Sequence, residues 1–383
     1  MENFTNKQIN FDILKERAHN LRWAEVPDGV IPLTAADHDF PCAPEVVEAL
    51  TDYIKDGYFP YIENRGMERF KEDLAKSFRE RKNEPVEAKY VLPIDSAARG
   101  MQVIADAFLQ PGDECLVFDP VDFLFRTSMS NAGATIKLFP SNLKEDRISL
   151  EGLENYITPK TKMIGFCNPH NPMGMLYTKE DLDYLLTLSE KYGFYIMNDE
   201  IWSDMIYPEA HFNTLTVYGF SKTFGVAGLR IGCVYATNQE NYDKLVEASM
   251  VDSTIGGINL LSQVAGIACL EKGFYRVDQF VQQITENRDY ALQRIAAMPE
   301  IKCHKPQATF VIFPDITETG MDPVELVELL KTKYKLAIVP GGERFFGPGS
   351  EGHVRICLAT SHEVLEEGLN RLEACLKDLM SAK

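Results

Sequence analysis

The sequence predicts an α/β protein with two domains: a large one built on a mostly parallel seven-stranded sheet covered by helices, and a smaller αβ domain. Short apolar segments alternate with helical patterns over residues 90–275, which is typical of strands joined by helices in a parallel sheet. A second, shorter alternation follows over 276–383. The length of 383 residues also exceeds that of most single domains.

The predicted elements follow in chain order. Residues 1–30 have no clear period, and prolines and aspartates predict a loop over 31–44. Apolar residues at helical spacing predict helices over 45–56 and 67–81. The seven predicted strands of the large sheet are 90–93, 114–118, 135–139, 163–167, 195–198, 216–220 and 231–235, with helices over 98–109, 182–192 and 259–271. A long helix over 277–298 leads to strands at 309–313, 336–340 and 353–358 and helices over 323–334 and 361–380.

Composition and charge exclude several classes of protein. A chain that is 45% hydrophobic and 25% charged is typical of a globular protein with a substantial core. The net charge of −18 argues against a nucleic-acid partner, because no basic surface is offered to phosphates. An apolar span of about 18 residues and a signal peptide are both missing, which predicts no membrane partner and a cytoplasmic location. The eight dispersed cysteines lack metal-site spacing and indicate reduced core residues.

Lys222 is the first candidate catalytic residue. It follows the predicted strand 216–220, and Arg230 comes eight residues later. A lysine delivered by a strand end into apolar surroundings loses hydration, which lowers the pKa of its ammonium group. Its amine then becomes a nucleophile able to form a Schiff base with a carbonyl. The guanidinium of Arg230 suits a phosphate. The alternative interpretation is a solvated surface lysine after a strand.

The segment Ser221-Lys-Thr-Phe-Gly-Val-Ala-Gly-Leu-Arg230 resembles the pyridoxal-phosphate lysine motif of the class I/II aminotransferase family (fold type I). Asn168-Pro-His-Asn-Pro-Met-Gly174 is similar to the same family's Asn-Pro-x-Asn-Pro-x-Gly signature. The resemblance covers roughly residues 30–375 and implies pyridoxal 5′-phosphate as the cofactor. It also implies three regions: an arm and part of the small domain over 1–44, a cofactor-binding domain over 45–275, and a small domain over 276–383.

The resemblance assigns roles to residues near the predicted strand ends. Lys222 would hold the cofactor as an aldimine, Asp199 would pair with its ring nitrogen, and Asn171 would bond its ring oxygen. The phosphate would meet Ser96, Ala97, Ala98, Ser221 and Arg230, while Tyr61 would reach the phosphate of a neighbouring subunit in a homodimer. Ser96 and Asp199 have simpler alternatives, because a serine or aspartate at these positions often only caps a helix.

Arg355 is the candidate for binding the substrate's α-carboxylate. An arginine inside an apolar strand is costly unless it meets an anion, although an internal salt bridge would also suffice. In the family this position binds the carboxylate, and Ala36 would lie beside it.

Three positions depart from the family pattern. Gly219 removes one phosphate hydroxyl, and Asp122 stands where an aromatic residue stacks on the cofactor ring. We expect Phe123 or Phe125 to compensate for that aromatic. Trp202 replaces a tyrosine near the cofactor and cannot titrate as a phenol would.

The resemblance implies an aminotransferase that moves the amino group of an L-amino acid to a 2-oxo acid. An alternative remains open, because Ala36-Asp-His-Asp-Phe40 and Asp199-Glu-Ile-Trp-Ser-Asp204 resemble segments of the cystathionine β-lyase (C–S lyase) branch, which releases pyruvate and ammonia. A non-catalytic regulator with this fold is a third hypothesis. Because no matched position supplies a second cation, we expect a neutral, aromatic or sulfur-containing substrate.

Overall fold

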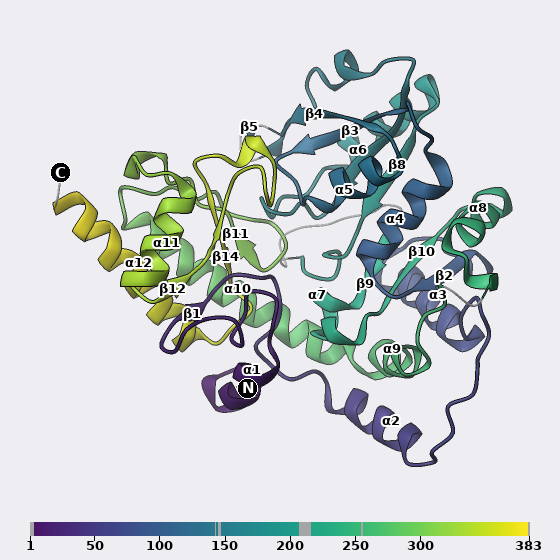
Figure 1. Cartoon of the computed structure of the whole chain (residues 1–383), viewed down its shortest axis with the longest axis horizontal. Helices are drawn as coiled ribbons and strands as arrows, with labels where there is room; N and C mark the ends of the chain where they lie inside the picture. The colour runs from purple at the N-terminus through teal and green to yellow at the C-terminus, as the bar shows by residue number, and fades with distance from the viewer. Residues whose placement is uncertain (1–3, 142, 145–146, 207–215, 254–255, 382–383) are drawn as a thin grey trace.

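A computed structural model describes residues 4–141, 143–144, 147–206, 216–253 and 256–381. A seven-stranded sheet lies at its centre (Figure 1), and its strands are β2 (Val91–Ile94), β10 (Gly232–Tyr235), β9 (Val217–Gly219), β8 (Tyr195–Asp199), β7 (Thr161–Cys167), β3 (Glu114–Asp119) and β4 (Thr135–Pro140), in that order. Strand β10 runs antiparallel to β2 and β9, and the other neighbours pair in parallel. The predicted mostly parallel seven-stranded sheet is confirmed.

The central strands are apolar because helices cover both faces of the sheet. Neighbouring residues point to opposite faces: Val117 packs in one core cluster and Leu116 in another. The Val117 cluster includes residues of α4 (Ala97–Phe108), α5 (Leu124–Asn131) and α8 (Gln239–Ser249). The Leu116 cluster includes residues of α6 (Lys179–Tyr192). The flanking helices α2 (Pro44–Ile54), α3 (Glu68–Lys82) and α9 (Leu260–Lys272) agree with the sequence prediction.

A second group of elements lies beside the sheet (Figure 1) and is reached through the long helix α10 (Phe274–Ala296). Its three-stranded antiparallel sheet has the order β11 (Val311–Ile312), β14 (Val354–Cys357) and β13 (Val339–Pro340). The short strand β1 (Ile31–Pro32) pairs in parallel with β12 (Leu336–Ala337), and α11 (Pro323–Lys333) and α12 (His362–Ser381) complete the group. The N-terminal segment therefore shares a core with the C-terminal part of the chain. The predicted domain limits at residues 44 and 275 remain predictions.

Three elements differ from the sequence prediction. The strand predicted over 336–340 is divided into β12 and β13, which belong to different sheets. Helix α1 (Phe11–Arg17) was not predicted, because it has no buried residue and therefore no apolar period in its sequence. Its start is capped by Asn10, whose Oδ1 accepts a hydrogen bond from Ile13 N at 3.1 Å. The strand predicted over 216–220 ends at Gly219, because Phe220 begins the short helix α7 (Phe220–Phe224). This change places Lys222 on a helical turn directly after β9.

All eight cysteines are free thiols, and six of them are buried. No helix within the described residues combines the length and the apolar character needed to cross a bilayer. The cytoplasmic location remains a prediction.

Candidate active site

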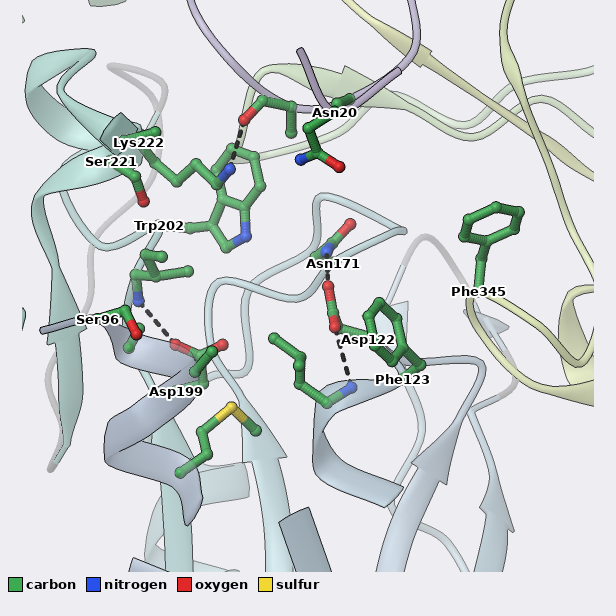
Figure 2. Close-up of a pocket in the computed structure, with 18 of the residues that line it drawn as sticks. Asn20, Ser96, Asp122, Phe123, Asn171, Asp199, Trp202, Ser221, Lys222 and Phe345 are labelled. Carbon is green, nitrogen blue, oxygen red and sulfur yellow. Dashed lines mark hydrogen bonds between the residues drawn. The ribbon is translucent and has the colours of Figure 1, made fainter. Parts of the chain in front are cut away.

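The predicted site residues meet at the carboxyl ends of the sheet strands, where ligands bind in folds of this type. Asp122 follows β3, Asn171 follows β7, Asp199 ends β8, and Lys222 follows β9. These residues line one cavity of about 330 Å³ (Figure 2). The second group of elements closes the cavity and contributes Val339, Phe345, Phe346 and Arg355. The site thus lies between the two groups of elements, and the N-terminal segment forms part of its wall.

Lys222 is held at the cavity by the loop that precedes α2. Its Nζ donates to the carbonyl oxygen of Ala36, and His38 Nε2 lies 2.7 Å from the backbone oxygen of Lys222. The Lys222 Nζ also lies 5.5 Å from the centroid of the Trp202 ring. Burial lowers the pKa of the Lys222 ammonium, and nearby Asp37 partly opposes this shift. The lysine is therefore a buried amine facing a cavity, as the sequence predicts.

Asp199 lies across the cavity from that amine and is itself buried. Its Oδ1 accepts from Ile201 N at 3.0 Å, so Asp199 does cap the turn that follows β8. Burial raises the pKa of this carboxyl group to about 7, because the Ile201 N–H only partly offsets the lost hydration. A protonated ring nitrogen would supply the positive charge that this buried group needs.

The start of α4 forms the part of the cavity predicted to hold a phosphate. Ser96 Oγ accepts from Arg99 N at 3.2 Å as an ordinary N-cap, and Ala97 and Ala98 also line the cavity. Anions are stabilised at such a helix start by its dipole and its free N–H groups. A Cβ at Gly219 would lie 3.2 Å from Ala97 Cβ. A larger residue at position 219 would therefore require this helix start to shift by a few tenths of an ångström.

Ser221 and Arg230 complete the predicted phosphate region, and both line the cavity. The backbone of Arg230 has a φ of 52°, which is uncommon for a residue other than glycine. Strained backbones of this kind concentrate at ligand sites.

Arg355 lies on β14 and is buried in the same cavity. Its Nη1 donates to Asn171 Oδ1 at 3.2 Å and its Nη2 donates to Thr34 O at 3.4 Å. Its Nε has no hydrogen-bonding partner in the described part of the chain, and no ion pair to Arg355 occurs there. Burial lowers the pKa of this guanidinium, and the Asp122 carboxylate opposes the shift. Among the described residues the guanidinium thus has no salt bridge, so its fork of donors is suited to a carboxylate.

Asp122 and Trp202, which depart from the family pattern, also line the cavity. Asp122 Oδ2 accepts from Asn171 Nδ2 at 3.0 Å, and Figure 2 shows the two side chains pointing toward each other. Trp202 is buried and packs edge-on against Phe310 at 4.8 Å between ring centroids. Phe123 lines the cavity, whereas Phe125 belongs to the buried core behind it. Of the two aromatics expected to compensate for Asp122, only Phe123 lies at the site.

Sequence reasoning missed several residues of the cavity wall, among them Asn20 and Leu21. Both have left-handed backbones, with φ of 62° and 64°. Glu25 fixes this turn, because its Oε1 accepts from Asn20 N at 3.1 Å and its Oε2 accepts from Leu21 N at 2.7 Å. The segment carries no periodic pattern, so no signal in the sequence pointed to it.

Tyr61 lies apart from these residues. It lies in the loop between α2 and α3, its side chain is 98% exposed, and it does not line the cavity. Its contribution across a subunit interface remains a prediction.

The model of the family described as aminotransferase class I and II matches residues 28–372. The chain belongs to this family. The sequence-based prediction of the family is thereby confirmed. Its members use pyridoxal phosphate, and within the described residues no cluster of three or more His, Cys, Asp or Glu could hold a metal ion.

Relatives of this aminotransferase-family chain include enzymes of two reaction types. The aspartate aminotransferase of Pyrococcus horikoshii is 30% identical over 365 residues, which cover 91% of each chain. The cystathionine beta-lyase PatB of Bacillus subtilis is 29% identical over 391 residues, covering 96% of this chain and all of PatB. The structure of cystalysin from Treponema denticola, which contains a pyridoxal 5′-phosphate cofactor, shares the fold with a TM-score of 0.90 at 24% identity, covering 99% of this chain and 100% of that one.

The residues of the cavity fit the same cofactor. Pyridoxal 5′-phosphate requires three groups: an amine for its aldehyde, a carboxylate for its ring nitrogen, and donors for its phosphate such as a helix start and an arginine. In this chain they are Lys222, Asp199, and Ser96 with Arg230, and all four line one cavity.

Proposed function

We propose that this protein is a pyridoxal-phosphate-dependent aminotransferase that moves the amino group of an L-amino acid to a 2-oxo acid. One observation carries the proposal: a buried arginine with an unpartnered Nε and a buried lysine with a lowered pKa line the same cavity. The arginine suits the α-carboxylate common to amino acids and 2-oxo acids. The lysine suits proton transfer at the carbon next to that carboxylate.

Each residue then has a defined part in the reaction. When bound, pyridoxal 5′-phosphate supplies an aldehyde that condenses with amines and a ring that withdraws electrons. Arg355 binds the α-carboxylate of the substrate, and Lys222 Nζ removes the proton from its Cα. Asp199 would hold the ring nitrogen, Asn171 the ring oxygen, and Ser96 with Arg230 the phosphate. Ala36 accepts a hydrogen bond from Lys222 Nζ, so its carbonyl keeps the free amine at the cavity wall.

A C–S lyase activity is the second candidate, and one observation favours it. The two segments that resemble the C–S lyase branch both contact the lysine-bearing helix α7. His38 Nε2 lies 2.7 Å from Lys222 O, and Asp204 Oδ2 accepts from Thr223 Oγ1 at 3.0 Å. The proton abstraction by Lys222 is common to both reactions. They differ in whether the substrate then loses a group from Cβ.

The deciding experiment incubates the cofactor-loaded protein with a panel of L-amino acids, with and without a 2-oxo acid acceptor. An aminotransferase converts the acceptor to its amino acid and releases no ammonia. A C–S lyase releases pyruvate and ammonia from cystathionine without any acceptor. If neither product forms from any amino acid, the transferase and the lyase are both excluded, and the non-catalytic regulator becomes the remaining hypothesis.

We also propose a cytoplasmic homodimer. The eight free thiols support a reducing compartment. The almost fully exposed Tyr61, with Tyr58 and Phe59 exposed beside it, supports a protein partner on this loop. The molar mass in solution, measured by light scattering, tests the dimer.

A further inference from the structure

One buried charge in the cavity has no part in the proposed chemistry. The charged residues that line the cavity are the cations Lys222, Arg230 and Arg355 and the anions Asp122 and Asp199. Four of these five have a role toward the amine, the phosphate, the α-carboxylate or the ring nitrogen. Asp122 is left over, and it occupies a position where the family has an aromatic side chain.

The carboxylate of Asp122 is fixed beside the site proposed for the α-carboxylate. Its Oδ1 accepts from Leu124 N at 3.1 Å and its Oδ2 accepts from Asn171 Nδ2 at 3.0 Å. The same Asn171 side chain accepts from Arg355 Nη1 at 3.2 Å through its Oδ1. Asp122 and Arg355 are therefore bonded to the two ends of one amide group, and neither can turn away without breaking a hydrogen bond.

Both oxygens of the Asp122 carboxyl group accept hydrogen bonds, which is the pattern expected of a carboxylate. Burial raises the pKa of this group, and the Leu124 N–H and the charges of Arg355 and Lys222 oppose that shift only in part. The hydrogen-bonding geometry thus places a carboxylate in the wall of the cavity.

Arg22, Arg126 and Arg344 lie close in the chain to residues of the cavity lining. The guanidinium of Arg22 is bonded to Asp39, and that of Arg126 is bonded to Glu343. The guanidinium of the exposed Arg344 lies over the Phe345 ring, 5.1 Å from its centroid. The other side chains around the mouth are apolar or uncharged: Asn20, Leu21, Phe123, Val339, Phe345 and Phe346. A substrate side chain ending in a carboxylate would meet the Asp122 carboxylate in a pocket of low dielectric constant. The three cations among the described residues of the cavity lining, Lys222, Arg230 and Arg355, are already assigned to other groups.

We propose that Asp122 excludes amino acids with an acidic side chain and restricts the enzyme to substrates with a neutral or basic side chain. This inference rests on the proposed function, because it assigns the specificity of the same site. The exclusion of acidic side chains would distinguish the substrates of this protein from those of its relatives that are named aspartate aminotransferases.

The test compares substrates that differ only by a carboxylate and an amide. The values of kcat/KM for aspartate against asparagine, and for glutamate against glutamine, are measured with the cofactor-loaded wild type, Asp122→Asn and Asp243→Asn. Asp243 is an exposed residue of α8 and serves as the control for the loss of one negative charge. The wild type prefers the amide in both pairs. Asp122→Asn reduces that preference roughly tenfold, because one close like charge is removed, while Asp243→Asn leaves it unchanged.

A binding measurement separates this inference from the proposed function. Dissociation constants for butanoate and succinate are measured by calorimetry on the same three proteins. Tighter binding of butanoate by the wild type, with a smaller difference in Asp122→Asn, supports charge exclusion even if no amino acid is turned over. In that case the proposed function fails and this inference stands. A wild type that takes aspartate as readily as asparagine, or ratios that stay the same in a folded Asp122→Asn, would overturn the inference.

Discussion

Thr223 Oγ1 donates to Asp204 Oδ2 over 3.0 Å, which ties the residue after Lys222 to the turn that follows β8. The hydroxyl of Tyr218 donates to the same oxygen at 2.6 Å, so Asp204 holds both β9 and α7. The side chain of Asp204 is only 4% exposed, and Arg81 Nε and Lys82 Nζ each lie 3.9 Å from its carboxylate oxygens. Lys222, the proposed catalytic lysine, is thus positioned by a buried carboxylate that does not line the cavity.

Asp204→Ala is expected to reduce both stability and activity. Two buried hydroxyls lose their acceptor, which costs about 2–4 kcal/mol in the free energy of unfolding. A small displacement of Lys222 is expected to lower kcat roughly tenfold or more. Urea unfolding and steady-state kinetics measure the two effects, and Asp243→Ala on the surface of α8 is the control. Unchanged kcat in a destabilised Asp204→Ala would show that Asp204 serves the fold alone.

Lys222→Ala is expected to abolish turnover while the fold persists. The substitution removes the amine that takes the Cα proton, and general-base catalysis of this kind contributes on the order of 10³ or more in rate. Lys179→Ala, on the exposed surface of α6, is the control for the loss of a positive charge. Rates of product formation are compared at equal concentrations of folded protein. Turnover by Lys222→Ala at the wild-type rate would contradict the assignment of Lys222 as the base.

The raised pKa of the Asp199 carboxyl group leads to a prediction of how the stability of the cofactor-free protein depends on pH. Burial raises the pKa of its carboxyl group from 3.8 to about 7, so the native state binds a proton more tightly than the unfolded chain. The free energy of unfolding therefore falls as the pH rises from about 4 to about 7, by at most about 1.4 kcal/mol per pH unit from this group. Asp199→Asn is expected to remove that decline.

The difference in the free energy of unfolding between wild type and Asp199→Asn isolates the contribution of Asp199 from those of other titrating groups. Burial lowers the pKa of His38 to about 4 from 6.5, so His38 contributes a slope of opposite sign between those values. Wild type and Asp199→Asn share this contribution. Urea unfolding of both cofactor-free proteins at several pH values therefore measures Asp199 alone. Parallel curves for the two proteins would show that its carboxyl group titrates normally.

Much of the site could be predicted because local patterns determine it. An apolar strand followed by a polar residue places that residue at the carboxyl edge of a parallel sheet, and Asn171, Asp199 and Lys222 all meet there. The limits of the predicted strands agree with the observed ones to within two residues. The exceptions are the strand predicted over 336–340, which is divided in two, and the strand before Lys222, which gives way to a helical turn at Phe220.

The missed features depend on contacts between distant residues. Arg355 and Asn171 are 184 residues apart, and the bond between them fixes how the Asn171 amide faces Asp122. No local period encodes such a pairing. The sequence also predicted that Phe123 or Phe125 compensates for the aromatic residue that Asp122 replaces, and only the fold shows that Phe123 lines the cavity while Phe125 lies in the core.

The turn at the cavity mouth gives the last prediction. Glu25 accepts from the backbone N–H groups of Asn20 and Leu21, and this holds both residues in the left-handed conformation that they otherwise disfavour. Glu25→Ala is expected to release the turn and to raise KM for the amino acid several-fold, roughly 3- to 10-fold, with a smaller effect on kcat. The reason is that Asn20 and Leu21 line the cavity, whereas the Lys222 Nζ is held by the carbonyl oxygen of Ala36.

Glu16→Ala is the matched control for this variant, because Glu16 is an exposed residue of α1 whose carboxylate contacts only Arg17 among the described residues. Full kinetic curves for the wild type and both variants separate KM from kcat. A fall in kcat at constant KM would place the turn in the chemical step instead of substrate capture. Equal KM values in all three proteins would show that the strained turn at Asn20 and Leu21 has no part in binding.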